Sequence, residues 1–184
     1  MFNQSYKEII ICILFLFGII SYFLLDHISI HAIGLFLIIT SGFYFVDRIT
    51  SAHFKKEHYV YVSFISLSFL FFYYMQLYFL YVDKVLHLLG GIMLCSVVYH
   101  FIGTMHISRR KKYLVTFSLS IAVILGYEFY EYFSDVIFNT RMQGVYRIVE
   151  NELVIVIGSV IDTASDIVIG LTGVIVYLVV KVRR

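Results

Sequence analysis

The stretch VLHLLGGIMLCSVVYHFIGTM, residues 85–105, contains no Lys, Arg, Asp or Glu and is long enough to cross a bilayer as one helix. Five further apolar runs of similar length accompany it, so that the six runs lie at residues 9–25, 28–46, 60–81, 85–105, 113–137 and 159–180. The runs are long and their polar and apolar residues do not alternate, which favours helices over a β-barrel. We therefore predict an all-α, polytopic membrane protein, a bundle of about six transmembrane helices that forms a single domain over residues 1–184.

The composition supports a chain that is solvated by lipid. Of its 184 residues, 61% are hydrophobic and 14% are charged, and the mean hydropathy is +0.91. Soluble domains are ~45–50% apolar and ~25% charged, so this chain could not build a water-facing surface. Its net charge of +2 is too small to indicate nucleic-acid binding. The first run lacks a small-residue cleavage site, so we expect it to remain as a helix.

The basic residues predict the orientation. If the N-terminus is cytoplasmic, 11 of the 14 Lys and Arg residues fall on the cytoplasmic side, as the positive-inside rule requires. These are Lys7, Arg48, Lys55, Lys56, Arg109, Arg110, Lys111, Lys112, Lys181, Arg183 and Arg184. Only Lys84, Arg141 and Arg147 fall outside. We therefore expect a multi-pass protein of a prokaryotic cytoplasmic membrane, with both termini in the cytoplasm.

The acidic residues show the opposite bias, because nine of the 12 fall in the outer half of a span or outside the membrane. Three segments concentrate them: DKVLHLLGG at residues 83–91, GYEFYEYFSD at 126–135 and IDTASDIVIGLTG at 161–173. Within each segment the polar residues stand three or four apart and therefore share one helix face. The pairs are Asp83 and His87, Glu128 and Glu131, and Asp162 and Asp166.

The topology predicts that these pairs meet at one depth. The fourth and sixth spans run inward from the outer surface and the fifth runs outward, so their outer halves can form one pocket with Asp83 at its mouth. Gly90 and Gly91 follow His87 by one turn, and we expect them to let a neighbouring helix approach closely.

The cost of these acids argues for a role beyond packing. An ionised acid at the bilayer centre costs ~2.5–3.5 kcal/mol on insertion scales, so protonation, water, a cation or a metal must lower the penalty. Carboxylates with one imidazole suit Mg²⁺, Mn²⁺, Ca²⁺ or Zn²⁺. The predicted metal ligands are His87, Asp162, Asp166, Glu128 and Glu131. The residues expected to contact a substrate are Asp83, Lys84, Tyr127, Tyr130 and Gln76.

Other interpretations of the same residues stay open. The acids could form a structural hydrogen-bond network that locks three helices together, and Asp83 and Asp135 could be ordinary interfacial acids. The outer connection, about residues 138–158, contains VYRIVENELVIVIG. It could be a short interfacial helix or a re-entrant segment, or the last span could begin earlier, near Leu153.

The three acidic segments resemble a known pattern. The Asp83–Gly91 motif, the Glu-x-x-Glu of YEFYE, the Asp-Thr-x-x-Asp of DTASD and the Gly173 that follows look like the YjdF-type inner-membrane proteins. They are similar, more distantly, to the VanZ-like membrane family, in which Gln and Asn more often stand at the positions of Glu131 and Asp166. The resemblance covers about Asp83–Gly173 and implies a site of Asp83, His87, Glu128, Glu131, Asp162 and Asp166. The YjdF-type group carries no assigned chemistry, whereas VanZ-like proteins are associated with teicoplanin resistance, which implies a cell-envelope context.

Three functions follow as hypotheses. The first is a metal-dependent enzyme that acts on a lipid or lipid-linked headgroup, with Glu128 or Glu131 as the general base. The second is a cation- or proton-coupled transporter, although a through-path should show acids on both sides of the membrane. The third is a non-catalytic membrane subunit with a structural polar network. Membrane lipids are the expected partners, with a second copy of the chain or another membrane protein as further candidates.

Overall fold

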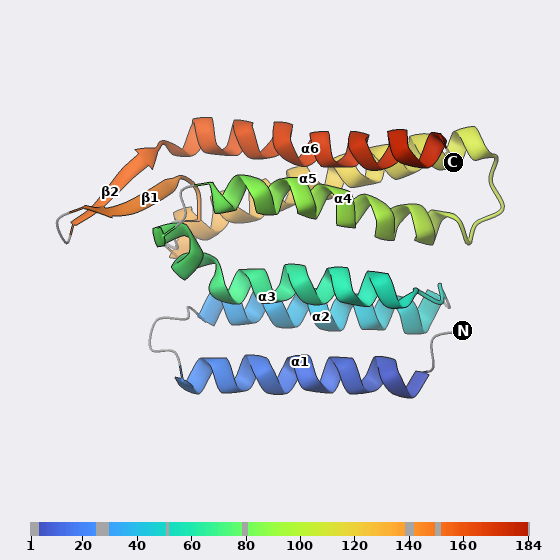
Figure 1. The fold of residues 1–184 in the computed structure, drawn as a ribbon, viewed down its shortest axis with the longest axis horizontal. Helices are drawn as coiled ribbons and strands as arrows, with labels where there is room; N and C mark the ends of the chain where they lie inside the picture. Colours follow the sequence, from blue (N-terminus) through green and yellow to red (C-terminus); the bar gives the residue numbers. More distant parts are fainter. Residues whose placement is uncertain are drawn as a thin grey trace. The chain divides into compact units, whose positions relative to one another are not determined.

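The computed structural model describes residues 4–24, 30–50, 52–78, 81–138, 142–149 and 152–183. Six helices and two strands lie within these residues (Figure 1). In chain order they are α1 (Gln4–Leu24), α2 (Ile30–Thr50), α3 (Lys56–Tyr78), α4 (Val82–Ile102), α5 (Arg109–Phe138), β1 (Val145–Val149), β2 (Glu152–Ile157) and α6 (Ser159–Val182). Each predicted apolar run coincides with one helix, so the all-α membrane fold is confirmed.

Four of the described helices are long and apolar enough to cross a membrane. The qualifying segments are Ile33–Thr50, Val82–Ile102, Arg109–Phe138 and Ser159–Val182, in α2, α4, α5 and α6. Their outward faces carry large apolar side chains, among them Val85, Phe129 and Val168, each more than half exposed. Outside a membrane these side chains would meet water, so the membrane-embedded helices contact lipid there.

The chain divides into two compact units, residues 1–73 and 74–184. In the first unit, successive helices run in opposite directions (Figure 1). Leu14 of α1 and Phe36 of α2 form its apolar core, with Ile10 and Leu67 packed against them. A Cβ added at Gly18 would lie only 2.7 Å from the Phe36 ring, so α1 approaches this ring closely because position 18 has no side chain.

A polar network joins the three helices of this unit. Lys7 Nζ of α1 lies 2.5 Å from Asp47 Oδ2 of α2. The same oxygen accepts a hydrogen bond of 2.5 Å from the Tyr59 hydroxyl of α3, while Asp47 Oδ1 accepts one of 2.9 Å from the Phe54 backbone N–H. We call these four residues the Asp47 network. Both oxygens of the buried carboxylate are satisfied, and one lysine balances its charge.

In the second unit α4, α5 and α6 pack together, and α5 ends at the end of the bundle where α4 and α6 begin (Figure 1). The backbones of α4 and α6 touch: a Cβ on Gly91 would collide with the Gly170 carbonyl oxygen, and one on Gly173 with the Leu88 carbonyl oxygen. The predicted close approach is therefore correct for Gly91. It is wrong for Gly90, since a Cβ added there meets nothing within 4 Å.

The segment between α5 and α6 differs from its prediction. Its described residues form an antiparallel hairpin, with Val145 opposite Ile157 and Val149 opposite Glu152. An interfacial or re-entrant helix is therefore wrong, and so is an earlier start of the last span near Leu153, because α6 begins at Ser159. The physical reason is that both arms are rich in Val and Ile, whose branched Cβ favours extended backbone.

Candidate functional site

The polar residues of the second unit gather where α4 and α6 begin and α5 ends. Five of them are buried acids, with 1–5% of each residue exposed: Asp83, Glu128, Glu131, Asp162 and Asp166. Lys84 and His87 of α4 lie among them. We call these seven residues the acid cluster. The predicted meeting of three helices at one depth is thus present in the structure.

Lys84 lies at the centre of the aspartates. Its Nζ is 2.5 Å from Asp162 Oδ1, 2.6 Å from Asp166 Oδ1 and 3.0 Å from Asp83 Oδ2. An ammonium group has three N–H donors, so these three carboxylates use all of them. The side chain is 14% exposed. Lys84 thereby fastens the first turns of α4 to those of α6.

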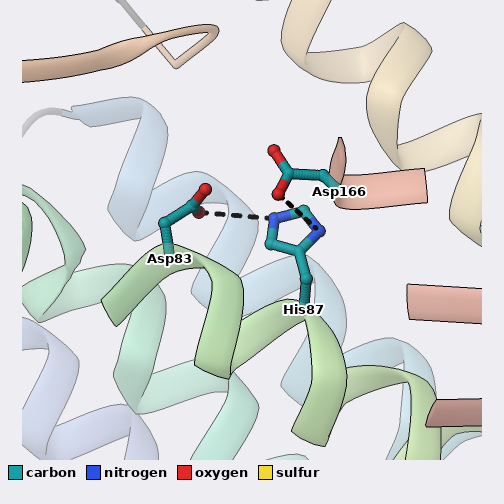
Figure 2. A group of neighbouring side chains, drawn as sticks. All are labelled: Asp83, His87 and Asp166. Carbon is teal, nitrogen blue, oxygen red and sulfur yellow. Dashed lines mark ion pairs between the residues drawn. The ribbon is translucent and has the colours of Figure 1, made fainter. Parts of the chain in front are cut away.

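His87 stands one turn below Asp83 on α4, with its ring between two aspartates (Figure 2). Its Nε2 lies 3.4 Å from Asp83 Oδ1, and its Nδ1 lies 3.9 Å from Asp166 Oδ1 on α6. The same Nδ1 is 3.7 Å from Glu128 Oε1 of α5. One imidazole therefore faces carboxylates from all three helices.

The two glutamates of α5 differ in their partners. Glu131 shares a hydrogen bond with the Tyr127 hydroxyl, one turn earlier on the same helix. Glu128 is 4% exposed, and neither of its carboxylate oxygens accepts a hydrogen bond from the residues that the structure describes. Since buried polar atoms are nearly always paired in native proteins, the Glu128 carboxylate indicates that a further positive or donor group belongs at this point.

Backbone donors complete the part of the site nearest to β1. Asp162 Oδ2 accepts a 2.7 Å hydrogen bond from the Gly144 N–H, just before β1. Gly144 has φ +98°, a conformation that favours glycine. Asp135 lies outside the acid cluster and accepts hydrogen bonds from the N–H groups of Met142 and Gln143. Asp135 therefore holds the connection to the hairpin.

The charges of the acid cluster do not balance. Among the described side chains, five carboxylates face one lysine and one histidine, so an ionised cluster keeps an excess of negative charge even when His87 is protonated. Buried carboxylates without compensating charge are costly in a low-dielectric environment. The arrangement is therefore suited to a cation.

A subset of the cluster has spacings that fit a metal ion. Asp83, His87 and Asp166 each offer one ligand atom, and these atoms lie within 4.8 Å of one another. With bonds of ~2.1–2.5 Å, ligands on opposite sides of an ion stand about 4–5 Å apart. The three side chains could thus share an ion. Glu128 lies close enough to His87 to supply a fourth ligand.

The predicted site residues differ in their position relative to the possible ion. Asp83, predicted at the mouth of the pocket, is buried and belongs to the metal-compatible set of Asp83, His87 and Asp166. Asp162, predicted as a ligand, instead contacts Lys84 and the Gly144 N–H. The Tyr127 ring centroid is 6.1 Å from that of His87, and the Tyr130 centroid is 6.3 Å from that of Tyr127. The side chain of Gln76 lies outside the described residues.

Sequence reasoning missed how central Lys84 is and overlooked the Asp47 network entirely. Lys84 is predicted only to contact a substrate, whereas its shortest contacts are to Asp162 and Asp166 of α6. A signal existed, because Asp162 and Asp166 stand one turn apart on a span predicted to share one pocket with the span that follows Lys84. Lys7 carried no such signal, since its partner lies 40 residues away.

Comparison with known proteins identifies the family to which the chain belongs. No curated protein matches the chain. No solved structure matches it either. A family model described as "Predicted membrane protein (DUF2238)" matches residues 6–184, which is nearly the whole chain. Together with its apolar helices, this match shows that the chain is a membrane protein of the DUF2238 family.

Proposed function

We propose that this membrane protein binds one divalent cation in the acid cluster. Asp83, His87 and Asp166 would hold the ion, with Glu128 as a further ligand. The observation that carries the proposal is the buried Glu128 carboxylate, whose Oε1 lies 3.7 Å from His87 Nδ1 and whose two oxygens accept no hydrogen bond within the described part of the chain. A hydrogen-bond network that served only to lock helices would leave no such carboxylate unsatisfied.

Lys84 alone cannot serve as the counter-ion of the whole cluster. Its three donors are taken by Asp83, Asp162 and Asp166, so none reaches Glu128. A divalent ion supplies two positive charges at one point and accepts several oxygens and a nitrogen at once. Such an ion would lower the cost of burying Glu128 and the aspartates together.

The donor set narrows the choice of ion. Carboxylate oxygens suit Mg²⁺, Ca²⁺ and Mn²⁺, whereas imidazole nitrogen suits Zn²⁺ and other transition metals. Mn²⁺ and Zn²⁺ accept both ligand types, so they are the first ions to test, ahead of Mg²⁺ and Ca²⁺. When bound, such an ion polarises a phosphate or carbonyl oxygen or activates water.

The surroundings of the cluster suggest a lipid or lipid-linked headgroup as the substrate. The helices that carry the cluster contact lipid, and the outward faces of Phe129, Tyr132 and Phe133 flank it on α5. Glu128 or Glu131 would serve as the general base, and Tyr127 with Tyr130 would contact the headgroup. The distribution of Lys and Arg favours an extracytoplasmic opening, and the likeness to YjdF-type and VanZ-like proteins favours a role in the cell envelope.

A cation carrier is the second candidate. Thr116 and Ser120 continue the buried face of α5 below Glu128; Ser120 shares a hydrogen bond with Cys95, and the Thr116 hydroxyl has no hydrogen-bond partner among the described residues. This polar stripe could conduct ions or protons. Against it, Ile124 lies between Ser120 and Glu128 and packs with Cys95 and Val174. An apolar layer of this kind favours a site that is open on one side only.

Metal analysis of detergent-purified protein tests the proposal. The protein is stripped of metal with EDTA, incubated separately with Mn²⁺, Zn²⁺, Mg²⁺ and Ca²⁺, and desalted. The metal content per chain is then measured by inductively coupled plasma mass spectrometry. We expect one ion per chain in the wild type and its loss in His87→Ala and Asp166→Asn. Glu57→Gln, at an acid whose side chain is 43% exposed, is the control that keeps the ion.

Two outcomes would contradict the proposal. If the wild type retains none of the four ions, and the two variants are as stable as the wild type, the acid cluster is structural. If reconstituted vesicles show an ion flux that Glu128→Gln and Ser120→Val both abolish, the carrier replaces the binding site as the function.

A further inference from the structure

Lys84 and the proposed divalent ion need the same oxygens. Asp166 Oδ1 faces His87 Nδ1 and also lies 2.6 Å from Lys84 Nζ. Asp83 likewise uses one oxygen for His87 and the other for Lys84. Two of the three proposed ligands are therefore already engaged by an ammonium group that belongs to the chain itself.

We infer that Lys84 is a tethered competitor of the bound cation and thereby makes the acid cluster selective for divalent ions. This inference rests on the proposed function. The cluster has two states: one in which Lys84 contacts Asp83, Asp162 and Asp166, as in this structure, and one in which the ion takes Asp83 and Asp166 and the ammonium group withdraws from them.

Electrostatics makes the two states exclude each other. An ammonium group and a divalent ion on the same Asp166 oxygen would repel strongly, because the surroundings screen charge poorly. Lys84 can withdraw because its stem is flexible and its side chain is 14% exposed. Asp162 stays held by the Gly144 N–H and can keep the ammonium group after Asp166 has released it.

Competition of this kind discriminates by charge. Exchanging the ammonium group for Na⁺ or K⁺ replaces one positive charge by another and gains no electrostatic energy. Exchanging it for a divalent ion doubles the positive charge beside Asp83, Asp166 and Glu128. Lys84 would therefore exclude the abundant monovalent ions while admitting a divalent one, and this makes it a specificity-determining residue.

The affinity of Lys84→Met for Mn²⁺ and Zn²⁺ tests the inference. The EDTA-stripped, full-length protein in detergent is titrated against a fluorescent chelator, with Lys84→Arg as the variant that keeps the charge. We expect Lys84→Met to bind the ions at least about tenfold more tightly than the wild type, and 100 mM Na⁺ (about physiological ionic strength) to weaken its binding but not that of the wild type. Unchanged or weaker binding by folded Lys84→Met would overturn the inference.

A chemical readout on the wild type keeps the test decisive if Lys84→Met does not fold without metal. Lysines are acetylated with and without saturating Mn²⁺, and the modification at Lys84 is compared with that at Lys56, which is exposed in the other unit. We expect Mn²⁺ to raise acetylation of Lys84 several-fold and to leave Lys56 unchanged. Equal labelling of Lys84 in both conditions would contradict the two-state model.

The outcomes separate this inference from the proposed function. If the wild type binds an ion, but Lys84→Met gains no affinity and Lys84 labelling does not change, only the inference fails. If the wild type binds none of the ions and Lys84→Met binds one, the inference stands and the proposed function of the wild type fails. If neither protein binds an ion, both fail.

Discussion

Each unit of the molecule buries a lysine against aspartate, yet the two sites are built on different charge balances. In the Asp47 network one lysine meets one carboxylate, and the remaining donors come from the Tyr59 hydroxyl and the Phe54 N–H. In the acid cluster one lysine contacts three aspartates with its three donors, and two buried glutamates lie in the same cluster.

The difference separates a structural site from a binding site. A balanced network with every oxygen satisfied gains nothing from a further cation, so its role is to hold α1, α2 and α3 together. An unbalanced cluster with an unsatisfied carboxylate is more stable once a cation is added. Four experiments would break or sharpen this contrast.

The largest effect is expected from Asp47→Ala. The substitution leaves the Lys7 ammonium buried, at 6% side-chain exposure, without a counter-ion. Removing one partner of a buried pair costs about 3–5 kcal/mol, so the free energy of unfolding in detergent should fall by this amount. The exposed pair of Lys55 and Glu57 is the control, and Glu57→Gln should change stability by less than about 0.5 kcal/mol. If Asp47→Ala lowers the free energy of unfolding by less than ~1 kcal/mol, the Asp47 network does not have this structural role.

Addition of the divalent ion should give the next largest effect. At an ion concentration about 100 times Kd, a ligand that binds only the folded state stabilises it by ~2.7 kcal/mol. We expect this shift, measured by thermal unfolding in detergent, in the wild type and in Asp47→Asn. It should disappear in Asp166→Asn. A shift that survives in Asp166→Asn would locate the ion outside the acid cluster.

The packing of α4 against α6 should give a smaller effect. Gly173→Ala places a methyl group against the Leu88 carbonyl, and separating the backbones should cost about 1–3 kcal/mol and weaken ion binding. Gly90→Ala is the matched control in α4, because an added Cβ meets nothing there. Since Ala favours a helix over Gly, this control should be slightly more stable than the wild type. Equal losses in the two variants would show that helix contact does not set the site.

The smallest effect is expected from Glu128→Gln, where the sign of the change in the free energy of unfolding carries the information. In the metal-free protein the substitution removes a buried negative charge that accepts no hydrogen bond from the described residues, so the free energy of unfolding should rise by up to about 1 kcal/mol. Asp47→Asn, measured beside it, should lose stability, because its carboxylate is paired. A loss of stability in metal-free Glu128→Gln would indicate that the native site already satisfies this carboxylate.

Most of the fold was predictable from the sequence, because a lipid environment leaves few options. Apolar runs of about 20 residues can only span a bilayer as helices or rest in a core, and all six coincide with helices. The pairing of β1 with β2 was missed because the two strands are apolar and short. Length and Val and Ile content distinguish such strands from a helix better than hydropathy does.

The sequence predicted which residues form the candidate site, but not which of them contact one another. Spacings of three and four residues put Asp83 with His87 and Asp162 with Asp166 on single helix faces, and this local rule is reliable. Which faces then turn toward one another depends on tertiary packing, as the contacts of Lys84 with residues 78 and 82 positions later illustrate. The Asp47 network was not predicted for the same reason, since Lys7 was interpreted only as a signal of membrane orientation.

The contact of Gly91 with Gly170 has a consequence for protein engineering. At this point the backbone of α4 contacts the backbone of α6, so the distance between the two helices does not depend on a side-chain rotamer. The polar positions one or two turns away are then carried on a rigid frame, and their chemistry can be exchanged without moving that frame. The helix pair is therefore a natural scaffold on which other ligand sets could be installed within a bilayer.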